Sequence, residues 1–331
     1  MPYYVRGELM TSHPEFTNEV SKYSTTSLLE LIGLVCAKYA TWEEWTDPSG
    51  GNPPPPSDVS PWALAHIART AILHRNERKR VPEARDLIRL CGLYVHIKEP
   101  VLAYREEADA LLRLGIRLTQ EQLPYQTDPS VDLARMGALL CNTRFPMDRT
   151  PKFFTPGWDE QILGMPLKNY MNMIYTLWAF AVTNKGQFRL QWLNEPQHQF
   201  LADYFQVDSA HGPFKSDWSL HIEDFPAANE ALAQSVEDGY RKYEVNPLWT
   251  RPFVGLPDGR FIAPVSQLIV RKASPTGIFY SVPEARRNQF AVELGYLFEE
   301  YVGDNLRLIP GADVIKEIMY NHIGNQGSCA D

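Results

Sequence analysis

The spacing of apolar residues changes near residue 246, and this change constrains the fold more than any other feature of the sequence. Before it, apolar side chains recur every three or four positions, as in Leu64, Ile67 and Ala71, which is the spacing of amphipathic helices. After it, the spacing shortens toward the alternation of β-strands. The sequence therefore predicts an α+β fold, with a mainly helical region over residues 1–244 and a short, incomplete α/β segment over residues 245–331.

The helical region is interrupted by two segments that are poor in regular spacing. Helices are predicted over residues 24–45, 62–80, 83–97, 101–114, 131–140, 168–182, 194–207 and 226–243. Residues 47–61 contain two glycines and a run of four prolines, and because proline has no N–H to donate, this segment is predicted to be a loop or linker. Residues 143–167 contain four prolines among aromatic side chains and are predicted to be an irregular connection.

The C-terminal segment begins with a β-hairpin signal. Pro257, Asp258 and Gly259 stand between two β-prone runs, as in a tight turn. Further strands are predicted over residues 268–272, 278–282 and 314–320. A long helix is predicted to begin at Pro283 and to run to about residue 309, since proline is favoured in the first turn of a helix.

Composition argues against several classes of protein. The longest apolar stretch, Tyr170–Val182, is interrupted by Asn172 and is shorter than the roughly 20 residues of a membrane span. The N-terminus has no basic stretch followed by an unbroken apolar run, as a secretory signal would. We therefore expect a cytoplasmic protein without a membrane partner. The net charge of −8 disfavours broad electrostatic capture of nucleic acid but leaves room for a local basic patch.

The sequence lacks the common motifs for zinc, nucleotide phosphates and serine hydrolysis. No histidine pair has metal-binding spacing, and there is no phosphate-binding glycine loop or nucleophile elbow. The four cysteines form no CxxC pair, and Cys36, Cys91 and Cys141 lie in apolar helical patterns, so they are predicted to be buried free thiols.

One constellation in the C-terminal segment carries chemistry. The run Gly295–Val302 (GYLFEEYV) lies on the predicted long helix, an apolar strand follows, and Ser328-Cys329-Ala330-Asp331 comes next. In this order the segment resembles the start of the PD-(D/E)XK, or restriction-endonuclease-like, nuclease fold of uncharacterised and defence-associated bacterial proteins. The resemblance covers about residues 246–331. It implies that Glu299 and Asp331 are catalytic residues and ligands of Mg²⁺, with Glu300 as a solvated neighbour.

The resemblance ends before the ExK motif, in which the family supplies another acid and a lysine. Mg²⁺ is usually held by carboxylates together with substrate phosphate and water, so two carboxylates alone make an incomplete site. We therefore expect this chain to be a fragment of a metal-dependent nuclease acting on DNA or RNA, inactive as given. The alternative is a non-catalytic helical interaction or scaffold protein, and a glutamate on a long helix is ordinarily just a solvated residue.

Basic residues flank the nuclease-like segment. Arg271 with Lys272, and Arg286 with Arg287, are predicted contacts to the nucleic-acid backbone, although either pair could equally be surface charge. The run Arg75–Arg80 is interpreted as a solvated helix end, because basic residues there suit the helix dipole. We expect the helical region to serve an accessory or sensing role, with a protein as its partner.

Overall fold

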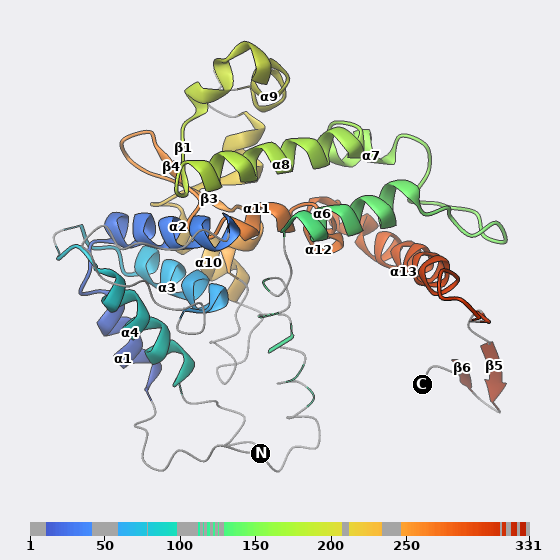
Figure 1. Cartoon of the computed structure of the whole chain (residues 1–331), viewed down its shortest axis with the longest axis horizontal. Helices are drawn as coiled ribbons and strands as arrows, with labels where there is room; N and C mark the ends of the chain where they lie inside the picture. Colours follow the sequence, from blue (N-terminus) through green and yellow to red (C-terminus); the bar gives the residue numbers. More distant parts are fainter. Residues whose placement is uncertain are drawn as a thin grey trace.

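The computed structural model describes residues 11–41, 59–77, 79–97, 129–206, 212–233, 246–311, 313–315, 319–322 and 325–328, with six single positions between 112 and 125. Over these residues the protein is mostly helical with a small sheet, which confirms the predicted α+β fold class. Figure 1 shows α1 to α4 gathered at one end of the molecule, while α13 leads away toward β5 and β6. No helix within the described ranges has both the length and the apolar character needed to cross a membrane.

The N-terminal helices pack around a shared apolar core. They are α1 (His13–Val20), α2 (Thr25–Thr41), α3 (Pro61–Leu73) and α4 (Ala84–Val95). Ser12 starts α1 with a capping box, since its hydroxyl accepts the Glu15 N–H at 3.3 Å and its own N–H donates to the Glu15 carboxylate at 2.7 Å. Helix α3 is buried over Ala63–Ile72. The helices predicted over 24–45 and 83–97 are confirmed. The helix predicted over 62–80 ends earlier, at Leu73, so the described residues of the run Arg75–Arg80 are not a helix end as predicted. Residues 42–58, with most of the predicted linker, lie outside the description.

The middle of the chain contains further helices and short turns of helix. In chain order they are α6 (Pro129–Gly137), a π-helical turn (Ala138–Asn142), α7 (Trp158–Leu163), α8 (Leu167–Thr183), 3-10 turns (Leu190–Asn194 and Pro196–His198), α9 (Gln199–Phe205), a second π-helical turn (Phe214–Trp218) and α10 (Phe225–Ala233). The expected helices near residues 131–140 and 168–182 are confirmed. The helix expected over 194–207 is shorter, because the chain turns at Pro196. The helix expected over 101–114 lies almost wholly outside the described residues.

A four-stranded sheet joins parts of the chain from both sides of residue 245. Its order is β1 (Gln187–Phe188), β4 (Phe261–Ile262), β3 (Phe253–Gly255) and β2 (Ser219–His221). Strands β3 and β4 form the predicted antiparallel hairpin, with Val254 opposite Ile262, and the turn between them uses Gly259 at a φ of 80°. Strand β2 pairs with β3 in parallel, and β1 pairs with β4 in antiparallel orientation.

The two apolar cores also contain residues from both sides of residue 245. One core joins Leu28 and Leu64 to Val254, and the other joins Leu177 to Phe253 and Phe290. The hairpin is therefore built into the helical body, and residue 245 separates neither the strands of the sheet nor the cores.

Two predicted strands are wrong, because both segments form helices. Residues 268–272 fall in and directly after α11 (Gln267–Arg271), and residues 278–282 fall in and directly after α12 (Pro275–Ser281). Ser274 caps α12 by accepting the Gly277 N–H at 3.1 Å, and Pro275 occupies the first turn. A short apolar run has no periodicity that distinguishes a buried strand from a buried helix. The cap at Ser274 favours the helix in α12, whereas α11 has no side-chain cap.

The last helix and the final hairpin follow the predicted order. Helix α13 (Glu284–Leu306) begins after Pro283, as expected, and buries Phe290, Glu293 and Leu297. Strands β5 (Met319–His322) and β6 (Asn325–Ser328) then form a separate antiparallel pair. The strand predicted over 314–320 is found as β5, which begins later, at Met319. Residues 313–315 have no regular structure, and Ile315 is 74% exposed.

Candidate functional site

Of the two predicted metal ligands, the structure describes only Glu299. Glu299 lies half-buried on α13 and forms no hydrogen bond or ion pair with the other described residues. Asp331 lies outside the described residues. Among the described residues, no group of three or more histidine, cysteine or acidic side chains is placed to hold a metal ion. Glu299 therefore has no partner among the described residues, and Asp331 has no described position.

A different carboxylate on the same helix is firmly engaged. Glu293 is 5% exposed, and its two oxygens accept from the backbone N–H groups of Lys152, Phe153 and Phe154 at 2.8 to 3.1 Å. Three consecutive amides thus surround one charge, which fixes the otherwise irregular segment after residue 150 against α13. Sequence reasoning missed Glu293, but a signal existed: an acidic residue shares the apolar helix face of Phe290 and Leu297.

The two arginines at the start of α13 both interact within the protein. The Arg286 guanidinium donates to the side-chain oxygen of Gln161 at 2.9 Å, and Arg287 donates to the carbonyl of Val282 at 3.0 Å. Each also lies over a phenylalanine ring, Arg286 at 4.7 Å and Arg287 at 5.6 Å from the ring centroid. These contacts hold the two side chains near the end of α12 and the α7 region, and phosphate contact by them stays a prediction.

The second basic pair does not lie on the open surface. The guanidinium of Arg271 lies 4.2 Å from the centroid of the Trp249 ring, and burial lowers its pKa. Lys272 is only 6% exposed. The interpretation of this pair as ordinary surface charge is therefore wrong, because the helix α11 turns both side chains inward.

Lys272 is one of the residues that line a cavity of about 400 Å³. Its ammonium donates to the backbone carbonyls of Asp217 and Thr250, both at 3.1 Å, and lies 5.0 Å from the centroid of the Trp218 ring. Burial is the main reason that the pKa of Lys272 falls to about 8, and the nearby positive charge of Arg251 lowers it further, while Asp217 opposes the change. The cavity is lined by residues from α7, α8, α9 and α12, from the π-helical turn before β2, from the segment after Trp249 and from the position directly after α11. These residues are Ile162, Leu163, Tyr170, Tyr204, Ser216, Asp217, Trp218, Thr250, Arg251, Lys272, Tyr280 and Ser281.

Two tyrosines in the cavity are held in the neutral form. Burial raises the pKa of Tyr170 far above its usual value, and it raises the pKa of Tyr204 to about 12; the Asp217 charge acts in the same direction on both. The Tyr204 hydroxyl donates to the carbonyl of Leu163 at 2.9 Å. Tyr170 is 3% exposed and its hydroxyl has no hydrogen-bond partner among the described residues. Both hydroxyls are therefore neutral at physiological pH. The Tyr170 hydroxyl can still donate a hydrogen bond, whereas the Tyr204 hydroxyl, which already donates to Leu163, can only accept one.

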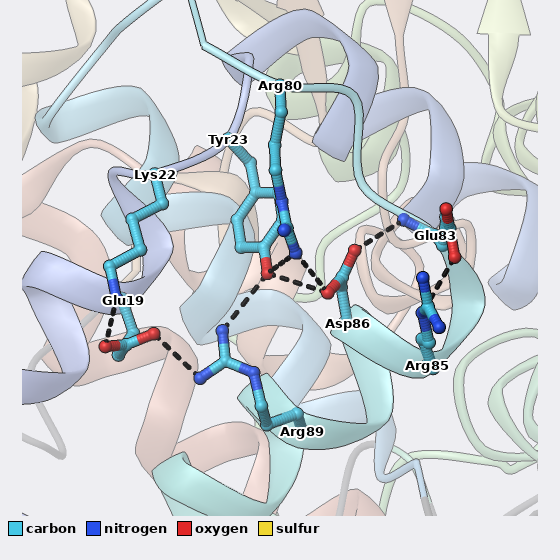
Figure 2. Close-up of polar contacts among 8 residues, drawn as sticks. All are labelled: Glu19, Lys22, Tyr23, Arg80, Glu83, Arg85, Asp86 and Arg89. Carbon is cyan, nitrogen blue, oxygen red and sulfur yellow. Dashed lines mark hydrogen bonds and ion pairs between the residues drawn. The ribbon is translucent and has the colours of Figure 1, made fainter.

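A separate polar cluster links α1 and the turn after it to α4 (Figure 2). The Tyr23 hydroxyl donates to Asp86 at 2.9 Å and accepts from Arg80 at 2.8 Å and from Arg89 at 3.1 Å. Burial opposes ionisation of Asp86, but hydrogen bonds from Glu83 N–H and Tyr23 together with the charges of Arg80 and Arg89 outweigh it, so the pKa of Asp86 is lowered. The arginines are thus paired internally, which suits a structural role for this cluster.

The other described basic residues of the run Arg75–Arg80 lie at the surface, in ion pairs or in solvent. Arg75 lies 3.7 Å from Glu77 and 3.4 Å from Glu223, and Lys79 is exposed. Arg78 lies outside the described residues.

Among the cysteines, Cys36 and Cys91 are buried as predicted, whereas Cys141 is exposed, so its predicted burial is wrong. The π-helical turn at residues 138–142 rotates Cys141 away from the core side of α6.

Comparisons with known proteins supply no relative for this chain. No protein-family model, no curated protein and no solved structure matches it.

Proposed function

We propose that the C-terminal segment is nuclease-like, of the kind that acts on the phosphodiesters of DNA or RNA, and that Glu299 and Asp331 are ligands of Mg²⁺. Because these two carboxylates alone leave the metal site incomplete, we expect the chain as given to bind the metal without cleaving nucleic acid. The observation that carries the proposal is the order of elements. The hairpin of β3 and β4 is followed by α11 and α12, then by the long helix α13 with Glu299, and then by the pair β5 and β6. Asp331 stands three residues beyond β6. This is the order on which the resemblance rests.

The state of Glu299 is suited to a metal ligand. A carboxylate committed to an internal ion pair would have to break that pair before it could bind a cation, whereas Glu299 has no such partner among the described residues. Mg²⁺ prefers carboxylate oxygens and retains water or substrate phosphate in its other positions. In this proposal Arg286 and Arg287, near the start of the same helix, contribute positive charge close to the nucleic-acid backbone, and the helical region supplies a protein-binding accessory surface.

The test is metal binding by the full chain, which does not depend on turnover. Mn²⁺ replaces Mg²⁺ at oxygen sites and is detected directly by electron paramagnetic resonance. We expect saturable Mn²⁺ binding that weakens at least about tenfold in Glu299→Gln and in Asp331→Asn, since each removes a charged ligand. Glu300→Gln is the matched control, because it removes the same charge from the next position of α13.

The control decides between the two classes of function. If Glu299→Gln and Glu300→Gln bind Mn²⁺ like the unaltered chain, the metal site is refuted. A non-catalytic helical interaction protein is then the better description.

A further inference from the structure

Lys272 is a buried cation that forms no ion pair with the other described residues. Among the described residues no carboxylate lies within ion-pair distance of its ammonium, and its two hydrogen bonds go to the neutral carbonyls of Asp217 and Thr250. An ammonium has three N–H donors, so one remains for a group in the cavity. A buried charge is costly unless it is paired, and an anion entering the cavity would supply the missing pair.

Two further groups in the cavity are free to meet the same anion. Arg251 is half-buried, and its guanidinium forms no hydrogen bond or ion pair with other described residues. The Tyr170 hydroxyl likewise has no hydrogen-bond partner among the described residues, although the residue is only 3% exposed. Three donors from α8, α11 and the segment after Trp249 therefore face one space of about 400 Å³.

From this arrangement we propose that the cavity binds a small molecule through an oxyanion group, a phosphate or a carboxylate, held by Lys272, Arg251 and Tyr170. The Arg251 guanidinium has paired N–H donors that match the oxygens of a phosphate or a carboxylate, and the Lys272 ammonium adds a second positive charge. Ile162, Leu163 and the tyrosine rings provide apolar surface for the rest of the molecule. The site is independent of Glu299 and of the proposed nuclease-like segment.

Asp217 restricts the charge of the ligand. It is an exposed residue that lines the same cavity, so Lys272, Arg251 and Asp217 together carry a net charge of +1. A singly charged oxyanion balances this set, whereas a second negative charge would face the Asp217 carboxylate. Monoanions are therefore expected to bind better than dianions of similar size.

A purely structural role for Lys272 makes a different prediction. If Lys272 only links two backbone carbonyls, Arg251 and Tyr170 do not bind a common ligand. Substitution of either residue would then leave the binding of oxyanions unchanged. The experiment therefore relies on Arg251 and Tyr170, whose substitution leaves the link between α11 and the two carbonyls in place.

The test is isothermal titration of the full chain with inorganic phosphate, phenyl phosphate and benzoate, with benzyl alcohol as the neutral comparison. We expect one-to-one binding of at least one oxyanion probe and none of benzyl alcohol. Arg251→Gln should weaken it about tenfold and Tyr170→Phe about threefold to tenfold, since each loses a hydrogen bond to a charged group. Arg144→Gln is the matched control on an exposed arginine of the same charge, and it should bind like the unaltered chain.

Lys272→Met should abolish binding, and Lys152→Met, on an exposed side chain, should not. If Lys272→Met fails to fold, the Arg251 and Tyr170 variants decide alone. The choice between benzoate and the two phosphates identifies the source of the oxyanion. The proposal is overturned if no oxyanion probe binds at about 10 mM, where even ligands with millimolar dissociation constants are mostly bound, or if Arg251→Gln and Tyr170→Phe bind as tightly as Arg144→Gln. Glu299→Gln should leave this binding unchanged, which separates the cavity from the metal site.

Discussion

Replacing Glu293 with glutamine should destabilise the protein far more than an ordinary change on α13. The carboxylate accepts from three consecutive backbone N–H groups, with the two Phe153 contacts at 2.9 and 3.0 Å. In Glu293→Gln one oxygen is replaced by an amide NH₂, which donates and therefore faces other donors. At least one buried N–H is then left without an acceptor, and the remaining bonds lose their charge.

The expected loss follows from those contacts. An unsatisfied buried donor costs about 1 to 3 kcal/mol, and hydrogen bonds to charged groups contribute about 1.5 to 3 kcal/mol, roughly twice the neutral value. We expect a decrease of about 3 kcal/mol in the free energy of unfolding. With an unfolding entropy of about 2.1 cal/mol/K per residue over 331 residues, this corresponds to a fall of roughly 4 °C in Tm, if the chain unfolds as one unit.

Two measurements check the reasoning. Thermal and urea unfolding followed by circular dichroism give the global change, and amide hydrogen exchange gives the local one, because the N–H groups of residues 152–154 should exchange faster. Glu284→Gln is the matched control: the same substitution at an exposed position on the same helix, with an expected effect below that of Glu293→Gln. Equal stability of the two variants, with unchanged exchange at residues 152–154, would refute the role assigned to Glu293.

Four further outcomes follow from the described contacts. The pKa of Lys272 is about 8 in the folded protein and about 10.4 when unfolded, so the unfolded chain binds more protons between these values and stability should rise with pH. Urea unfolding should show a rise of about 2 kcal/mol from pH 7.5 to pH 9.5, and Lys272→Met should lack it. Tyr23→Phe removes three hydrogen bonds with charged partners and should lower stability by about 2 kcal/mol, with no change in urea midpoint counting against the cluster of Figure 2. Gly186 has a φ of 83°, and an added Cβ would lie 2.8 Å from Gly33 Cα, so Gly186→Ala should cost about 3 kcal/mol or more in thermal unfolding. Gly295→Ala, where nothing lies within 4 Å of the new carbon, should instead stabilise α13 by about 0.5 to 1 kcal/mol.

Local sequence was sufficient for the elements that carry their own signals. The helix beginning at Thr25 has repeating apolar positions, α13 has Pro283 at its start, and the hairpin has its Pro-Asp-Gly turn. These features act between residues near one another in the chain, so they can be recognised without knowing what lies opposite. The same reasoning failed over residues 268–282, where short apolar runs fit either a strand or a helix.

The placement of charge depended on contacts between distant residues. Arg271 and Lys272 look like a surface pair in the sequence, and only the packing of α11 against the Trp218 and Trp249 segments turns them inward. Glu293 similarly acquires its role from amides about 140 positions earlier in the chain. Burial and hydrogen-bond partners of this kind arise from tertiary packing, and no local pattern encodes them.

The sequence by itself thus determined a mostly helical α+β chain, a hairpin near residue 258, a long helix bearing Glu299, and a net negative charge, because each depends on composition or on neighbours within a few positions. Only the tertiary structure decided that strands from both sides of residue 245 share one sheet and that a buried lysine, an arginine and a tyrosine meet in one cavity. The physical reason is that a cavity forms where several helices fail to fill the space between them, and that space is set by the whole fold.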